Sequence, residues 1–119
     1  MRFQKLKKPR KFSPLPGVEL QDMGNVYLRP DEQLTFVTES GKGNDIVRKP
    51  WGFYLSNSVS PNLKKKGFKT AILYSPMKPP RIYINLVEIK KMKEFKQYLK
   101  KFNVSVLCWL DEWFEEGKK

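Results

Sequence analysis

Lysine and arginine are the side chains of this sequence best suited to chemistry, because they outnumber the acids two to one. The chain of 119 residues has 24 Lys and Arg, 12 Asp and Glu and no His, which gives a net charge of +12. Cations at this density neutralise phosphates and release the counterions that surround nucleic acid. The charge therefore predicts a polyanionic partner, DNA or RNA.

The cations concentrate in three places. Met1 to Phe12 carries six cations and no acid, a second group follows residue 63, and a third lies on one face of a predicted helix. Each group could contact the phosphate backbone with little base specificity. The predicted contacts are Lys5, Lys7, Lys8, Arg10, Lys11, Lys64, Lys65, Lys66, Lys93, Lys96 and Lys100.

Two tyrosines offer a different contact with nucleic acid. Strand alternation places Tyr83 on the face opposite Ile82, and Tyr54 on the face opposite Phe53. An aromatic ring exposed on a sheet can stack on an unpaired base, which is worth about 1–3 kcal/mol per base. We expect Tyr54 and Tyr83 to form such a platform, with packing beneath the N-terminal part of the chain as the alternative.

One tripeptide has the form of a catalytic motif. Glu88-Ile89-Lys90 has the E-x-K pattern of metal-dependent nucleases, in which the acid and an upstream Asp hold Mg²⁺. The upstream Asp would be Asp31 or Asp45, but Glu88 is equally explained as an acid in the first turn of a helix. We therefore predict no catalytic residue, no metal ligand and no cofactor, and retain a small nuclease as an alternative.

The C-terminal segment, residues 109–119, is acidic and aromatic. Its four acids surround Trp109, Trp113 and Phe114, and the first 108 residues without it carry 22 cations and eight acids, a net charge of +14. We expect the aromatics to pack on the sheet. The alternative is an exposed motif that binds a protein partner or a second copy of the chain.

The elements that position these residues follow from periodicity and turn residues. We expect hairpins from Asn25–Leu28 with Leu34–Ser40 and from Phe68–Ser75 with Arg81–Glu88, a turn over Ser40–Asn44, and a strand over Ile46–Ser56 broken at Pro50. Val104–Leu110 is apolar on both alternate sets, which predicts a central strand. Cys108, the single cysteine, is then expected to be buried and unreactive.

Two helices are predicted. Apolar residues recur with helical spacing from Glu88 to Phe102, with the lysines on or beside the opposite face, and Asn103 ends the pattern. Ser60-Pro61 and Gly67 predict a shorter helix between them.

These elements predict an α+β fold, a two-layer sandwich with a mainly antiparallel sheet, one long and one short helix, and an N-terminal hairpin. The ferredoxin-like split βαβ order is one arrangement of it. We place a flexible basic arm at residues 1–17 and a single domain at 18–119. Because no apolar run could span a bilayer and no signal peptide is present, we expect an intracellular, cytoplasmic protein that does not bind membranes.

The sequence as a whole favours a non-enzymatic nucleic-acid-binding protein. An interaction module or adaptor in a larger protein or ribonucleoprotein complex is the alternative.

Overall fold

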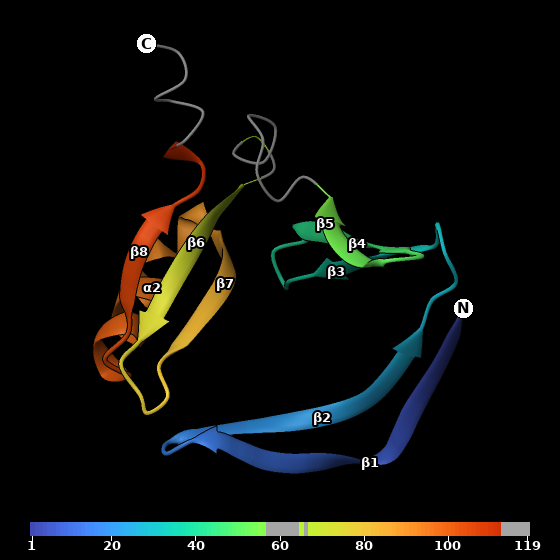
Figure 1. Cartoon of the computed structure of the whole chain (residues 1–119), viewed down its shortest axis with the longest axis horizontal. Helices are drawn as coiled ribbons and strands as arrows, with labels where there is room; N and C mark the ends of the chain where they lie inside the picture. Colours follow the sequence, from blue (N-terminus) through green and yellow to red (C-terminus); the bar gives the residue numbers. More distant parts are fainter. Residues whose placement is uncertain (57–64, 66, 113–119) are drawn as a thin grey trace. The chain divides into compact units, whose positions relative to one another are not determined.

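The computed structural model describes residues 1–56, 65 and 67–112, and most of them lie in antiparallel strands (Figure 1). They form three small sheets and one helix. The chain divides into two compact units, Met1–Leu34 with Ile46–Tyr54 and Thr35–Asp45 with Leu55–Lys119. The domain boundary expected at residue 17 stays a prediction.

The N-terminal hairpin consists of β1 (Arg2–Leu15) and β2 (Val18–Tyr27), joined by a turn in which Gly17 has φ 83°. The segment predicted as a flexible arm, residues 1–17, contains the whole of β1. The strand is not evident from the sequence, because a register shift between Lys5 and Arg10 interrupts the regular alternation of its side chains. Pro9 lies in this irregularity, where a missing N–H costs no ladder hydrogen bond.

The second sheet has the order β3-β4-β5, with β3 (Gln33–Val37), β4 (Gly43–Lys49) and β5 (Gly52–Ser56). The predicted hairpin of Asn25–Leu28 with Leu34–Ser40 is wrong, because residues 25–27 extend β2 and β3 pairs with β4 instead. The turn predicted from Ser40 is present: the Thr38 amide donates to the Lys42 carbonyl at 2.9 Å.

We predicted one strand interrupted at Pro50. Instead, β4 ends at Lys49 and Pro50 begins the connection to β5. With Trp51 it makes a two-residue turn into β5, and Gly52 follows at φ 144°. Proline suits this position because its fixed φ favours a turn and it has no N–H to lose from the ladder.

The third sheet has the order β7-β6-β8, with β6 (Phe68–Ser75), β7 (Arg81–Glu88) and β8 (Ser105–Trp109). The β6–β7 hairpin is confirmed, with Phe68 opposite Glu88 and Ser75 opposite Arg81. β6 is the central strand, so the central position predicted for Val104–Leu110 is wrong.

The prediction of a buried Cys108 fails for the same reason, since β8 is an edge strand and its thiol is exposed. Cys108 lies opposite Ile72, and a register irregularity in the next step of the ladder leaves Leu107 55% exposed. In β8, apolar side chains on both faces of the strand therefore do not mean that both faces are buried.

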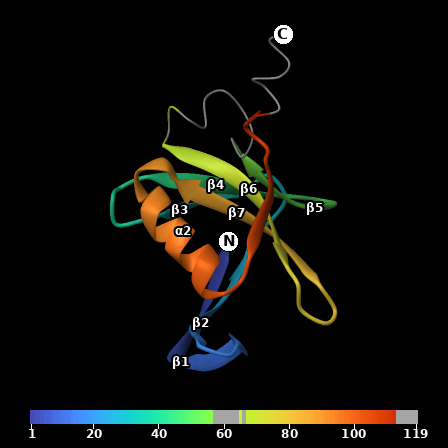
Figure 2. The ribbon, with the colours of Figure 1, turned by 90° about the vertical axis from the view of Figure 1, so that its left-hand side faces the viewer.

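The predicted long helix is confirmed as a 3₁₀ turn, η1 (Ile89–Lys91), followed by α2 (Met92–Lys101). It ends before Asn103, which adopts a left-handed conformation at φ 54°. α2 lies across one face of the third sheet (Figures 1 and 2), where Phe95 and Leu99 pack on a buried cluster of Ala71, Leu73 and Val104.

No second helix accompanies α2 in the described part of the chain, and the predicted short helix lies outside it except for Lys65 and Gly67. The ferredoxin-like order is wrong, because the strand before that segment, β5, belongs to another sheet. Among the described residues, no helix has the length and apolar character needed to cross a bilayer.

Candidate nucleic-acid interface

The outer face of α2 carries three exposed lysines, Lys93, Lys96 and Lys100. Phe95 and Leu99 turn toward the buried cluster, so the helical period directs these lysines away from it. Within residues 1–56, 65 and 67–112, none of the three forms an ion pair. Their full positive charges are therefore available to an external anion.

The cations of β1 are all exposed but differ in their partners. Arg10 pairs with Asp22 at 3.2 Å, and Lys11 lies 3.9 Å from Glu19. The Gly24 amide and then the Arg10 guanidinium, both bonded to Asp22, lower the pKa of that carboxyl. This favours the ionised form of Asp22, which pairs with the Arg10 guanidinium.

The other three cations predicted on β1, Lys5, Lys7 and Lys8, have no acidic partner among the residues described. Lys7 and Lys8 fall where the register shifts, and Lys5 lies opposite Gly24. Any β carbon at Gly24 would lie 2.1 Å from the Gln4 carbonyl oxygen, so a glycine permits the close approach of the two strands. Of the predicted run, these three lysines remain the available cations.

The predicted group at Lys64, Lys65 and Lys66 is mostly beyond what the structure describes. Lys65 is described and exposed, whereas Lys64 and Lys66 lie outside the described residues. Their contribution to binding stays a prediction.

The prediction of an exposed Tyr83 is wrong. Tyr83 lies opposite Leu73 on the face of the third sheet covered by α2, and it packs against the buried cluster. The exposed apolar residues of β7 are instead Ile82 and Ile84, at 64% and 67%. The face assignment from alternation was inverted because the exposed side of this strand is the more apolar one.

Tyr54 is exposed, as predicted, and it has a partner that the sequence reasoning missed. The Trp51 indole stacks on its ring, with centroids 6.2 Å apart and planes inclined by 23°. Trp51 is 72% exposed and Tyr54 45%. The Pro-Trp-Gly sequence was the available signal, since it places a tryptophan at the tip of a tight turn.

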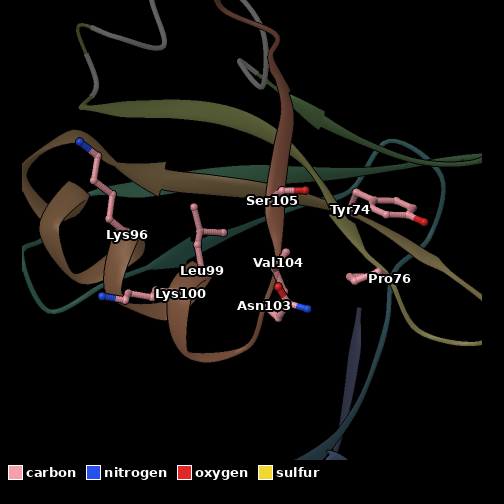
Figure 3. A pocket seen from close by; sticks show the side chains of 8 residues that line it. All are labelled: Tyr74, Pro76, Lys96, Leu99, Lys100, Asn103, Val104 and Ser105. Atoms are coloured by element: carbon pink, nitrogen blue, oxygen red, sulfur yellow. The ribbon is translucent and has the colours of Figure 1, made fainter.

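A pocket of about 500 Å³ lies beside the C-terminal end of α2 (Figure 3). Leu99, Val104 and Pro76 line it together with Lys96 and Lys100, and no carboxylate is among its lining residues. In Figure 3 both ammonium groups point away from Pro76 on the far wall. Two lysines therefore border the pocket, but their ammonium groups do not point into it. They are oriented toward a ligand outside the pocket and not toward an anion bound within it.

Glu88, the acid of the E-x-K tripeptide, binds the β3–β4 turn. Its carboxylate accepts hydrogen bonds from the Thr38 hydroxyl and, at 3.0 Å, from the Ser40 hydroxyl, beside a hollow of about 360 Å³ that Lys91 also lines. The geometry gives Glu88 a structural role in holding this turn to the end of β7.

The two aspartates considered as metal partners are also engaged. Asp45 accepts from the Thr35 hydroxyl at 2.6 Å, and Asp31 pairs with the Lys49 ammonium. Within the described residues, no group of three or more His, Cys, Asp or Glu could hold a metal ion. The nuclease alternative gains no support from these positions.

The contacts of Glu88 predict a pH-dependent contribution to stability. Bonding to the Thr38 hydroxyl, then to the Ser40 hydroxyl, lowers the pKa of Glu88 from its ordinary 4.5, and Lys42 and Lys91 add to the effect. A carboxyl whose pKa is depressed by folding stabilises the protein above its unfolded-state pKa and loses this effect as pH falls through its folded-state pKa.

We therefore expect Glu88→Gln to destabilise the protein near neutral pH, and the difference from wild type to shrink as pH falls below 4.5. Free energies of unfolding of both proteins, measured over this range, check it. A difference that does not change with pH contradicts the assignment.

The described part of the acidic aromatic segment is packed. The Trp109 ring meets Phe95 edge-on at 5.8 Å, and the Lys69 ammonium lies 4.6 Å above it. Asp111 is buried and accepts from the Thr70 amide at 2.6 Å. Trp113 and the residues after it lie outside the described residues, so their packing and any role in partner binding stay predictions.

Comparison with known proteins adds no relative: no protein-family model, no curated protein and no solved structure matches this chain. The case for function therefore depends on the geometry alone.

Proposed function

We propose that the protein is a non-enzymatic nucleic-acid-binding protein that contacts the phosphate backbone through the outer face of α2 and the unpaired lysines of β1. The observation that carries this proposal is the row of exposed lysines on α2, Lys93, Lys96 and Lys100, without acidic partners in the described structure. The acid of this helix, Glu94, is exposed too but forms no ion pair with these lysines in the described structure.

The spacing of these lysines suits a chain of phosphates. Residues 93, 96 and 100 are separated along the helix axis by about 4.5 and 6 Å. One strand of duplex DNA carries a phosphate about every 3.4 Å of its axis. Three long, mobile ammonium groups over about 10 Å could therefore neutralise successive phosphates.

The type of cation favours backbone contact over base reading. Lysine is a flexible point charge, whereas the planar fork of arginine gives bidentate recognition of guanine. On β1, three of the four cations outside an ion pair in the described structure are lysines, and the fourth, Arg2, lies 4.2 Å over the Tyr27 ring. We therefore propose little base specificity for both DNA and RNA.

A salt titration of binding to single- and double-stranded DNA and RNA tests the proposal. We expect the logarithm of the affinity to fall linearly with the logarithm of salt concentration, with a slope of about −0.9 for each neutralised duplex phosphate and about −0.7 for single strands. Absence of binding at low salt, or affinity that ignores ionic strength, contradicts backbone contact.

An interaction module in a larger complex is the second candidate, and one observation favours it. Ile82 and Ile84 of β7 are 64% and 67% exposed on the face of the third sheet that α2 does not cover. Contiguous exposed apolar residues often mark protein–protein contacts. Absence of nucleic-acid binding in the salt titration would favour this candidate.

A further inference from the structure

The stacked pair of Trp51 and Tyr54 at the β4–β5 turn has no part in the proposed phosphate contacts. Its rings are nearly parallel and 6.2 Å apart, and Trp51 is the most exposed large apolar residue described, at 72%. Exposing an indole to water forgoes the free energy of its burial. Tryptophan in such a position is typical of a binding contact.

The turn holds this ring outward. Pro50 and Trp51 form the two-residue connection between β4 and β5, so the indole is at the tip of a hairpin. Gly52, at φ 144°, provides a backbone conformation that other residues rarely adopt. Stacking on Tyr54 restricts the indole further, so less rotamer freedom is lost when a ligand binds.

The charges beside the turn favour an anionic ligand. Arg48 donates to the Lys49 carbonyl oxygen and forms no ion pair within the described residues, so its charge is not neutralised. The ammonium of Lys49 is paired with Asp31, which leaves a net positive charge at the end of β4. A flat ring on the same hairpin as a cation that forms no ion pair in the described structure suits a base and its phosphate.

We propose that Trp51 and Tyr54 form a stacking site for an unpaired base, so that the protein prefers single-stranded nucleic acid. This inference rests on the proposed function, because the lysines supply the phosphate contacts that hold the strand. Bases within a duplex are covered by their neighbours, whereas an unpaired base has a free face for the Trp51 indole. The ligand class is therefore single-stranded DNA or RNA.

Trp51→Ala in the full chain tests the stacking site with two ligands, an oligothymidylate and an abasic oligonucleotide of equal length that keeps the phosphates but has no bases. We expect affinity for the oligothymidylate to fall about 5- to 150-fold, with no change for the abasic strand. Trp51→Phe, which keeps a ring, should recover much of the loss. Phe53→Ala is the matched control, because Phe53 is 62% exposed on the same strand but points to the opposite face.

A fluorescence measurement on the wild-type protein tests stacking without relying on a variant that could fail to fold. The wild-type protein should quench the fluorescence of a 2-aminopurine placed in the oligothymidylate, and Tyr54→Ala should reduce this quenching. Unchanged oligothymidylate affinity in Trp51→Ala, or an equal loss for the abasic strand, overturns the stacking site. If wild type binds the oligothymidylate through Trp51 but not the abasic strand or duplex, the stacking site is supported and the phosphate proposal fails.

Discussion

Reversing three charges on α2 should abolish nucleic-acid binding while the protein stays folded. Lys93→Glu, Lys96→Glu and Lys100→Glu together remove three exposed, unpaired cations and place three like charges against the phosphates. Like-charge juxtaposition costs several kcal/mol, so we expect affinity at low salt to fall by on the order of 100-fold or more. Stability should change little, because exposed substitutions usually stay within about 0.5 kcal/mol each.

A variant with the same change in net charge separates position from total charge. Arg29→Glu, Lys78→Glu and Arg81→Glu also reverse three exposed cations, but none of them is on α2 or β1. We expect this control to lose much less affinity than the α2 variant. Equal losses in the two variants would mean that net charge, and not the helix face, determines binding.

The largest effect on stability should come from Leu73→Ala. Leu73 is 1% exposed at the centre of the third sheet, where it belongs to the buried cluster beneath α2. Truncating a buried leucine removes favourable burial and leaves a cavity, which together cost about 2–5 kcal/mol. Urea denaturation followed by circular dichroism should show this loss for the unit that contains α2.

Ile82→Ala provides the comparison on the other face of the same sheet. Ile82 is 64% exposed, so little burial is lost and we expect a change of no more than about 0.5 kcal/mol. If Ile82→Ala destabilises the protein as much as Leu73→Ala does, then the uncovered face is buried in solution and the packing described for the third sheet is incomplete.

Local patterns predicted the β6–β7 hairpin and α2 well. Both ends of the two strands agree with the structure, because five intervening residues permit little but a tight connection. The helix was evident because the apolar residues recur with helical spacing and Asn103 marks where the pattern ends. Elements of this kind are specified by residues close together in the chain.

Strand partners and faces were predicted poorly, because they depend on residues far apart in the sequence. Nothing near Tyr83 shows that α2 covers its side of β7 and leaves Ile82 in solvent. Cys108 likewise belongs to an apolar strand whose position at the sheet edge depends on β6. Apolar content alone does not distinguish these arrangements.

For the candidate site, the sequence predicted which cations exist but not which are available. Arg10 and Lys11 have acidic partners across the hairpin, and those pairings follow from a register that the sequence did not show. The lysines of α2 were predicted more successfully, since helical spacing alone separates them from the packed face. Trp51 was missed because its exposure follows from the turn and not from strand alternation.

The most direct test of the central claim compares salt dependence in wild type and in a variant with Lys93→Gln, Lys96→Gln and Lys100→Gln. If all three lysines neutralise phosphates of a duplex, the slope of log affinity against log salt should become less steep by about 2.7, which is about 0.9 for each lost contact. Parallel lines for the two proteins would show that these lysines release no counterions on binding, and would contradict the account.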